Sequence, residues 1–323
     1  MPPSSDPKLI LLADIGGTHA RFTLANENEF SPITTLETGN YEDAGTAIQT
    51  FLDQIRLGSR PQVAALACAG PVEQGFVQLT NSDWQIDAVR LQIDLGIDEV
   101  ILVNDFAAVA WAIPCLRDSD LRRIGGGKPV TGTPAAVLGP GTGLGVAGYV
   151  PHEGGATAIV GEGGHITMPA TTRLETELFA ELHKELDHVS AERLLSGDGL
   201  VCLYHSLARL SSDRVPERTA AEITDAALAQ SCGVSQAAVD MFCAMFGTFA
   251  GNVALTFGAR GGIYIAGGIV PRIVDYFAAS EFRRRFEAKG RFQEYVARIP
   301  TWVVLHPEPA FLGLVRMLRK GPS

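Results

Sequence analysis

The sequence predicts an α/β protein of two domains, and three observations lead to this prediction. The chain has 323 residues, more than a single hydrophobic core usually covers. Apolar strand patterns alternate with helical patterns, as expected for a parallel or mixed sheet covered by helices. A glycine-bearing turn between two apolar strands occurs twice, at residues 14–18 and 139–145, which is expected of two related domains that face each other across a cleft.

Short apolar runs define the strands of the first half. Strands are predicted at residues 9–13 and 20–25, on either side of the first glycine turn. The continuous apolar runs 63–68 and 99–103 are predicted as strands buried on both faces. Apolar side chains at helical spacing predict a helix within residues 44–57, before Gly58.

The second half repeats this pattern and then becomes helical. Strands are predicted at residues 135–138 and 146–150, around the second glycine turn. Helical patterns dominate residues 173–257, and a strand, a Gly-Gly pair and a helix start follow within residues 261–272.

The end of the chain is predicted to return to the first domain. Residues 301–305 form the last strand candidate, and a short helix is expected from about Pro309. The predicted domains are therefore a small α/β domain of residues 1–110 with 301–323, and a large one of residues 111–300.

Charge and composition exclude several classes of protein. The net charge of -10 disfavours a nucleic-acid partner, because that partner requires a basic face. The five cysteines are scattered without a CxxC pair, which is typical of buried thiols in a reducing compartment. No signal peptide is evident, and no uninterrupted apolar run reaches the roughly 18 residues of a membrane helix. We therefore expect a cytoplasmic protein with neither a nucleic acid nor a membrane as partner.

The first glycine turn has the composition of a phosphate site. Gly16 and Gly17 allow a ligand to approach the backbone, and Thr18 and the backbone amides can donate to phosphate oxygens. Asp14, at the end of the strand, can hold Mg²⁺ through water. The alternative is an ordinary glycine hairpin with an aspartate that caps the turn.

Two further glycine motifs follow later in the chain. The turn Gly139–Gly145 offers a second set of bare amides, and Gly267-Gly268 lies between a buried strand and a helix start. Glycine-rich turns are common, and close packing of a helix on a strand explains the last pair equally well. Three such corners in this order are nevertheless far more specific than any one of them.

An acid and an amide follow the strand predicted at residues 99–103. Asp105 lies at the carboxyl end of a buried strand, where open α/β sheets bind ligands, and it could accept the proton of a hydroxyl nucleophile that Asn104 orients. The alternative is that one of the two caps the following helix. A cap does not require both residues, which favours the functional interpretation.

Polar groups in a glycine-rich turn indicate recognition of a polyol. Glu162 and His165 could accept and donate hydrogen bonds to neighbouring hydroxyls, although a plain surface loop is the alternative. Ser190 is predicted as a helix N-cap with Glu192 in the first turn, where an acid favours the helix dipole in any case. Glu192 alone therefore supports no functional assignment.

Together these segments resemble the bacterial glucokinases of the hexokinase and actin-like ATPase superfamily. The resemblance rests on DIGGTHAR, VNDFAAVAWAIP, GPGTGLGVA, GEGGH, HVSAERLLSG and GGIYIAGGIVPR, in order from about residue 9 to about residue 314. The related ROK sugar kinases carry a cysteine-rich zinc motif after GGH, whereas the next cysteine here is Cys202, which favours the zinc-free group. His19 departs from the pattern, because these sequences usually carry asparagine there.

The resemblance implies a fold and an activity. It implies two ribonuclease-H-like (actin-like ATPase) domains around a central cleft, and transfer of the γ-phosphoryl group of ATP, with Mg²⁺, to O6 of glucose to give glucose 6-phosphate and ADP. Members of the family often form homodimers. The alternatives are a kinase of another hexose, such as mannose, fructose or an N-acetylhexosamine, and a sugar-binding regulator without catalysis.

The resemblance also implies roles for residues that match the family motifs. Asp105 matches the catalytic base. The positions that match sugar-binding residues are Asn104, Asp105, Glu162, His165 and Glu192. The positions that match ATP-binding motifs are Ala13, Asp14, Ile15, Gly16, Gly17, Thr18, Gly141, Thr142, Gly143, Gly267 and Gly268.

Overall fold

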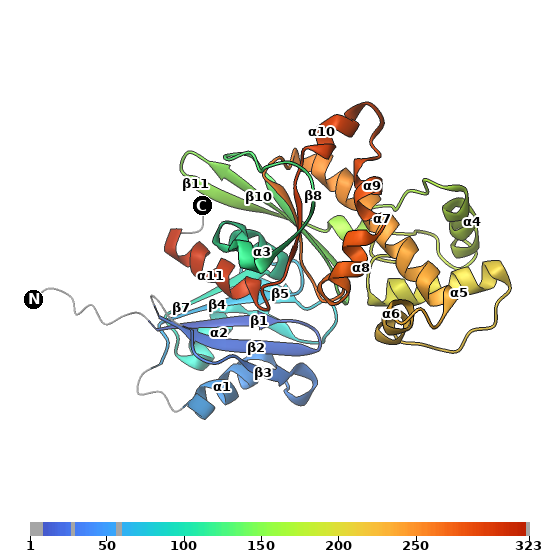
Figure 1. Cartoon of the computed structure of the whole chain (residues 1–323). Coiled ribbons are helices and arrows are strands. Elements are labelled where there is room, and N and C mark those ends of the chain that lie inside the picture. Colours follow the sequence, from blue (N-terminus) through green and yellow to red (C-terminus); the bar gives the residue numbers. More distant parts are fainter. Residues whose placement is uncertain (1–8, 27–29, 56–59, 321–323) are drawn as a thin grey trace, which may run out of the picture. The chain divides into compact units, whose positions relative to one another are not determined.

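The computed structural model describes residues 9–26, 30–55 and 60–320. The chain folds into two compact units, which we describe separately (Figure 1). Unit 1 holds the described residues up to Leu116 together with those from Pro307 onward, and unit 2 holds Arg117–His306. The two α/β units each contain one main sheet.

Unit 1 is built on a five-stranded sheet in the order β3-β2-β1-β4-β7. The strands are β1 (Ile10–Ile15), β2 (His19–Ala25), β3 (Thr34–Glu37), β4 (Val63–Cys68) and β7 (Glu99–Asn104). β1, β4 and β7 run parallel, whereas β2 and β3 are antiparallel additions. Because Ile15 pairs with Cys68 and Cys68 with Asn104, the carboxyl ends of the three parallel strands meet at one edge.

The helices of unit 1 cover this sheet and bury its apolar residues. They are α1 (Ala44–Ile55), α2 (Ala88–Leu95), α3 (Asp105–Ala112) and α11 (Pro309–Lys320), and a small hairpin is formed by β5 (Phe76–Gln78) and β6 (Gln85–Asp87). α11 packs closely on α3, because a side chain at Gly313 would collide with the carbonyl of Ala108. The end of the chain thus completes unit 1, next to the helix that follows β7.

Unit 2 is built on a six-stranded sheet in the order β11-β10-β9-β12-β13-β8. The strands are β8 (Leu121–Gly125), β9 (Ala135–Pro140), β10 (Leu144–His152), β11 (Gly155–Gly161), β12 (Gly262–Ile265) and β13 (Thr301–Val304). β9, β12 and β13 run parallel. The prediction placed residues 301–323 in the first domain, but β13 pairs with β12 and β8, so the chain returns to unit 1 only from Pro307.

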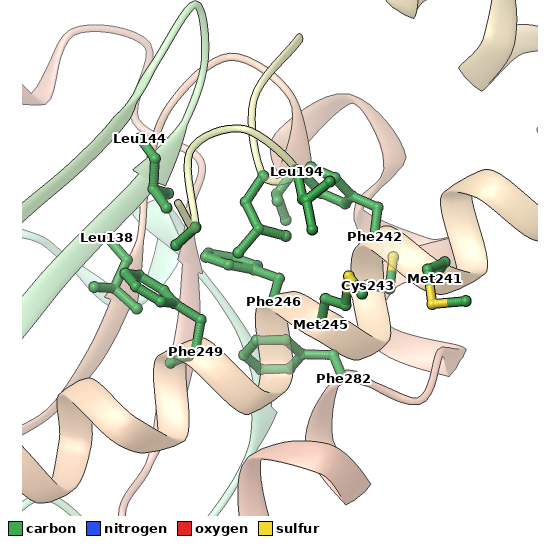
Figure 2. Close-up of a cluster of buried hydrophobic side chains, with 14 of the residues drawn as sticks. Leu138, Leu144, Leu194, Met241, Phe242, Cys243, Met245, Phe246, Phe249 and Phe282 are labelled. Carbon is green, nitrogen blue, oxygen red and sulfur yellow. The ribbon is translucent and has the colours of Figure 1, made fainter. Parts of the chain in front are cut away.

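The helices of unit 2 pack around one long apolar helix. They are α4 (Arg173–Leu182), α5 (Gly197–Ser211), α6 (Ala220–Leu228), α7 (Gly233–Phe257), α8 (Val274–Ala279), α9 (Phe282–Glu287) and α10 (Gln293–Ala297). Figure 2 shows Phe242, Phe246 and Phe249 of α7 packed among buried side chains that include Phe282 of α9. These aromatic side chains form the centre of the unit 2 core.

The helix α7 bears on the expectation that no segment of the chain is a membrane helix. Its 25 residues include an 18-residue window of mean hydropathy 1.4, so by length and composition alone this helix could cross a membrane. However, 78% of that window is buried inside the fold. A core helix of a globular protein passes the same test, and the packing of α7 is that of a core helix.

The segment before α5 also differs from its prediction, because Ser190 caps no helix. The amide of Ala191 donates to the carbonyl of Ile166, and that of Met168 donates to Val189, so this segment pairs with residues 164–168 in extended form. The helix starts only at Gly197, where the side chain of Ser196 accepts from the amide of Gly199. The hydroxyl of Ser190 still accepts from the amide of Arg193 at 3.3 Å, so the local signal produces a single turn, while the long-range backbone pairing holds the segment before it.

Candidate functional site

In unit 1, Asn104 and Asp105 lie where β7 passes into α3. The side chain of Asn104 accepts from the amide of Ala107 at 3.1 Å and donates to the carbonyl of Gly70 at 3.2 Å. Asn104 is thus the N-cap of α3 and also ties the end of β7 to the segment that follows β4. Asp105 is half-buried in the first turn of the helix, and the cap does not depend on it.

The first glycine turn, residues 16–18, is held by the chain itself. Gly16 donates its amide to the carbonyl of His19 at 2.9 Å, and the hydroxyl of Thr38 donates to the carbonyl of Gly17 at 2.6 Å. A Cβ at Gly17 would lie 2.5 Å from the backbone oxygen of Asn81, which is closer than real contacts allow. The close approach that this glycine permits is therefore made by another segment of unit 1, while Thr18 is exposed.

Asp14 is held at the same sheet edge by an arginine. Arg21 lies 3.2 Å from the carboxylate of Asp14 and 3.4 Å from that of Glu308, which precedes α11. Burial raises the pKa of both carboxyls, and the guanidinium of Arg21 acts against this rise. Burial also raises the pKa of the Cys68 thiol, with Asp105 and Asp14 as further causes, so both carboxylates lie near the end of β4.

Sequence reasoning missed Arg21 and Glu308. A signal for Arg21 existed, because the hairpin formed by β1 and β2 pairs Asp14 directly with Arg21. Side chains of directly paired antiparallel residues lie on the same face, so the turn length was sufficient to find this partner. For Glu308 no local signal existed, since it comes from the other end of the chain.

In unit 2, the two later glycine motifs lie together at the carboxyl ends of β9 and β12. Gly141 donates its amide to the carbonyl of Gly143 at 2.8 Å and closes the turn. A Cβ on Gly141 would lie 3.9 Å from the amide nitrogen of Gly268. Gly267 has a φ of 85° and would place a Cβ 2.5 Å from the carbonyl of Pro140, so this position requires glycine.

Glu162, His165 and Glu192 form a polar cluster beside this turn. The two ring nitrogens of His165 lie 3.9 Å from the carboxylate of Glu162 and 4.0 Å from that of Glu192. Glu192 also accepts from the amide of Leu144 at 2.8 Å, and a Cβ on Gly143 would lie 2.6 Å from its Oε2 atom. The structure thus brings three residues from the GEGGH and SAER segments to the second glycine turn.

This cluster can bind hydroxyl groups. The side chains of Glu162 and His165 are 58% and 54% exposed, so their polar atoms are open to a ligand, whereas Glu192 is 32% exposed and fixed by a backbone amide. Carboxylates accept and an imidazole both donates and accepts, which is the set of groups that neighbouring sugar hydroxyls require.

The comparisons with known proteins agree with these observations. A sequence model of the glucokinase family matches residues 11–321. The glucokinase of Paramagnetospirillum magneticum is 46% identical, over 96% of this chain and 98% of its own. The crystal structure of a glucokinase from an Antarctic psychrotroph is 34% identical with a TM-score of 0.86, covering 98% of this chain and 100% of its own.

A more distant likeness shows the fold alone. A ROK family glucokinase from Streptomyces griseus, solved in complex with glucose and AMPPNP, is 18% identical with a TM-score of 0.66, covering 97% of this chain and 100% of its own. These neighbours are sugar kinases of the actin-like ATPase type, which confirms the predicted fold class. With a family match over nearly its whole length, this chain belongs to the glucokinase family.

Proposed function

We propose that this protein is a glucokinase that transfers the γ-phosphoryl group of ATP to O6 of glucose, giving glucose 6-phosphate and ADP. The observation that carries the proposal is the position of Asp105, a half-buried carboxylate at the carboxyl end of β7, next to an asparagine that already serves as the helix cap. Family membership supports the same activity.

Asp105 is the proposed general base. It accepts the proton of the 6-hydroxyl as that oxygen forms its bond to the γ-phosphorus, while the bond from phosphorus to the β,γ-bridging oxygen breaks and ADP leaves. Phosphoryl transfer depends mainly on positioning and on neutralisation of charge, and a fixed base also orients the attacking hydroxyl. The capping bonds of Asn104 fix the backbone that carries Asp105.

The remaining proposed sugar ligands are the other residues that match sugar-binding positions of the family. In unit 1, Asn104 binds the sugar beside the base. In unit 2, Glu162, His165 and Glu192 bind its hydroxyls, and their grouping around His165 supports this assignment. A site built to hydrogen-bond particular hydroxyls rejects sugars that leave those groups unpaired.

The nucleotide is assigned to the three glycine segments. The first segment, residues 13–18, and the second, Gly141–Gly143, are the proposed phosphate-binding turns, because each glycine turn lies at the carboxyl end of a strand of the parallel set. Gly267 and Gly268 are proposed to contact the adenosine. The adjacency of Gly141 and Gly268 supports a continuous nucleotide site on unit 2.

Asp14 fits an indirect role in binding Mg²⁺. The described residues contain no group of three or more histidine, cysteine, aspartate or glutamate side chains that could hold a metal ion directly. This agrees with the usual preference of Mg²⁺ for substrate phosphates, water and only one or two carboxylates. When bound, Mg²⁺ neutralises phosphate charge, and Asp14 would hold it through water.

Substitution of Asp105 tests the proposed mechanism. Asp105→Ala should lower kcat by about 10²–10⁴-fold in a coupled assay of ADP release, while glucose still binds. The exposed Asp98, which precedes β7, provides the control, since Asp98→Ala should leave kcat unchanged. A near-normal kcat of Asp105→Ala would exclude the assigned role.

A panel of sugars tests the proposed substrate. Glucose should give the highest kcat/KM among glucose, mannose, fructose and N-acetylglucosamine. A higher value for another sugar would make the protein a kinase of that hexose. Sugar binding without ADP release from any of them would make it a regulator.

Three further properties are proposed with the activity. We assign the chain to the zinc-free group, because no cysteine lies between GEGGH and Cys202. We also infer a homodimer, which sedimentation equilibrium should show as twice the 34.4 kDa chain mass. A cytoplasmic location accords with five free cysteines and is tested by cell fractionation.

A further inference from the structure

A cavity of unit 2 lies away from the glycine turns. Its volume is about 630 Å³, which is within the range of small-molecule sites. It is lined by residues that follow β8, precede β12 and precede β13; the lining side chains used below are Lys128, Arg260, Arg291, Phe292, Glu294, Tyr295 and Arg298.

The cavity and the glycine turns are at opposite edges of one sheet. Arg260 precedes the amino end of β12, whereas Gly267 and Gly268 follow its carboxyl end. A strand rises roughly 3.3 Å per residue, so the four residues of β12 separate the two edges by about 13 Å. The cavity is therefore not part of the proposed nucleotide site.

Positive charge is concentrated in this cavity, although the chain is acidic. Four of its lining side chains are cationic and one, Glu294, is anionic, whereas the whole chain has a net charge of -10. Within residues 9–26, 30–55 and 60–320, no carboxylate lies within ion-pair distance of Lys128, Arg260, Arg291 or Arg298. Four cations without an ion-pair partner around one cavity attract an anion to it.

Satisfaction of helix carbonyls does not explain Arg298. Arg298 follows α10, where a cation can satisfy helix carbonyls, but α10 has only five residues. The carbonyls of Val296, Ala297 and Ile299 are already satisfied by another residue, the largely buried Arg283. The exposed cations of the cavity are therefore left to interact with solvent or a ligand.

The cavity also has an aromatic wall. Phe292 and Tyr295 are 46% and 36% exposed, and their ring centroids lie 6.1 Å apart in an edge-to-face arrangement. The guanidinium of Arg291 lies 5.7 Å from the centroid of Phe292. Large apolar side chains that remain exposed beside cations can stack on a planar ring.

We propose that this cavity is a second ligand site, which binds a small organic phosphate with a planar ring, of the nucleoside diphosphate or triphosphate class. The four cations bind the phosphates, and the two aromatic side chains contact the ring. The site lies at the amino edge of the unit 2 sheet and is separate from the site of phosphoryl transfer.

Equilibrium dialysis with radiolabelled ADP tests this proposal. The wild-type protein should bind two ADP per chain, and the double variant Arg260→Gln/Arg298→Gln should bind one, with the second affinity lowered at least tenfold. The matched control is Arg173→Gln/Arg284→Gln, which removes the same charge from unit 2 at side chains that are 93% and 66% exposed. That control should still bind two.

Further measurements make each outcome decisive. Because all the substituted residues are exposed, the variants should fold, and an unchanged kcat of the double variant would verify this. The single variant Lys128→Gln, at an exposed loop position, should lower the affinity of the second site for ADP severalfold. It replaces the double variant in this test if the double variant fails to fold. Equal ADP binding by the wild type and both of these variants would overturn the proposal.

Two fragments test the class of ligand. Inorganic tripolyphosphate should displace ADP from the second site at more than tenfold higher concentration than ADP itself, and adenosine should bind more weakly still. If tripolyphosphate binds as tightly as ADP, the ring has no role and the nucleotide class is excluded. If the wild type binds a single ADP that the double variant loses, the second site stands and the proposed nucleotide site at the glycine turns fails.

Discussion

Replacement of Gly143 by alanine tests whether the second glycine turn holds Glu192 in place. The added Cβ would lie 2.6 Å from Oε2 of Glu192, whereas ordinary contact begins at 3.4 Å. The oxygen must therefore move by about 0.8 Å, the difference between these values. The same oxygen accepts from the amide of Leu144 at 2.8 Å, so this displacement lengthens that hydrogen bond by a part of the roughly 0.8 Å.

The expected magnitude follows from this hydrogen bond. A hydrogen bond to a charged acceptor contributes about 1.5–3 kcal/mol, and a part of this is lost when the bond lengthens. If Glu192 binds a sugar hydroxyl, part of this loss affects glucose affinity, because the carboxylate leaves its position. Full loss of the bond would raise KM for glucose roughly ten- to hundredfold, so we expect this partial loss to raise KM severalfold, with a smaller effect on kcat.

A double-mutant cycle isolates the contribution of Glu192. KM for glucose is measured for Gly143→Ala, Glu192→Ala and the double variant, with thermal unfolding as the check on folding. Gly143→Ala should have little further effect once Glu192 is alanine. Gly161→Ala is the control, since no atom lies within 4 Å of its added Cβ. Additive effects of the two substitutions, or an unchanged KM for Gly143→Ala, would refute the reasoning.

Three predictions concern stability. Gly17→Ala should destabilise the protein by about 1–3 kcal/mol, because its Cβ would lie 2.5 Å from a backbone oxygen. Gly16→Ala, whose Cβ would lie 3.5 Å from the nearest atom, should leave the free energy of unfolding unchanged. Urea unfolding of both variants measures this difference, and equal free energies of unfolding would contradict it. Glu175→Ala should cost about 3–5 kcal/mol in the same assay, because it leaves buried Arg285 without its carboxylate at 2.7 Å, and a cost below about 1 kcal/mol would contradict this. Burial lowers the pKa of Lys289 from 10.5 to about 8, so between these pH values the unfolded chain binds more protons than the folded one, and the free energy of unfolding should rise with pH there. The free energy of unfolding of the wild type and of Lys289→Met is measured at each pH, and the variant should lack this part of the rise. If the two plots of free energy against pH run parallel, the prediction is wrong.

Much of the fold could be predicted from the sequence, because its central strands are continuous apolar runs. The run 63–68 is β4 with the same bounds, and all six of its residues are buried. The strands that were missed are the edge strands β3, β8 and β11 and the short hairpin strands β5 and β6. Unlike the edge strand β7, which carries an apolar run, β3, β8 and β11 have several exposed or half-buried positions and no long apolar run, so the pattern that identifies a central strand is weak in them.

The grouping of site residues depended on contacts that local patterns do not contain. The motif that carries Glu192 was predicted as a helix start, but the segment pairs with residues 164–168 and so brings Glu192 to His165. The ion pair of Arg21 with Glu308 joins opposite ends of the chain. The chemical roles of these residues remain predictions that the proposed substitutions test.

The glycines of the three motifs divide into two classes with different reasons for lacking a side chain. Gly17, Gly143 and Gly267 face the protein's own atoms, since a Cβ on each would lie 2.5–2.6 Å from Asn81, Glu192 and Pro140 respectively. Glycine at Gly17 and Gly267 is required by the fold without any ligand, because the atoms met there are backbone oxygens, whereas at Gly143 the end of the Glu192 side chain must shift. Loss of activity after substitution there is therefore no evidence for phosphate binding.

The other class comprises Gly16, Gly141 and Gly268, where a Cβ meets no atom closer than 3.5 Å. Alanine at these positions fits the fold and should leave the melting temperature unchanged or slightly raised, because it restricts the unfolded chain. If phosphate oxygens or adenosine contact these backbone atoms, the added methyl group occupies the ligand's space, and KM for ATP should rise at least tenfold. Unchanged melting temperature together with raised KM would thus separate ligand contact from folding, whereas an unchanged KM at all three would exclude the proposed contacts of the nucleotide with these glycines.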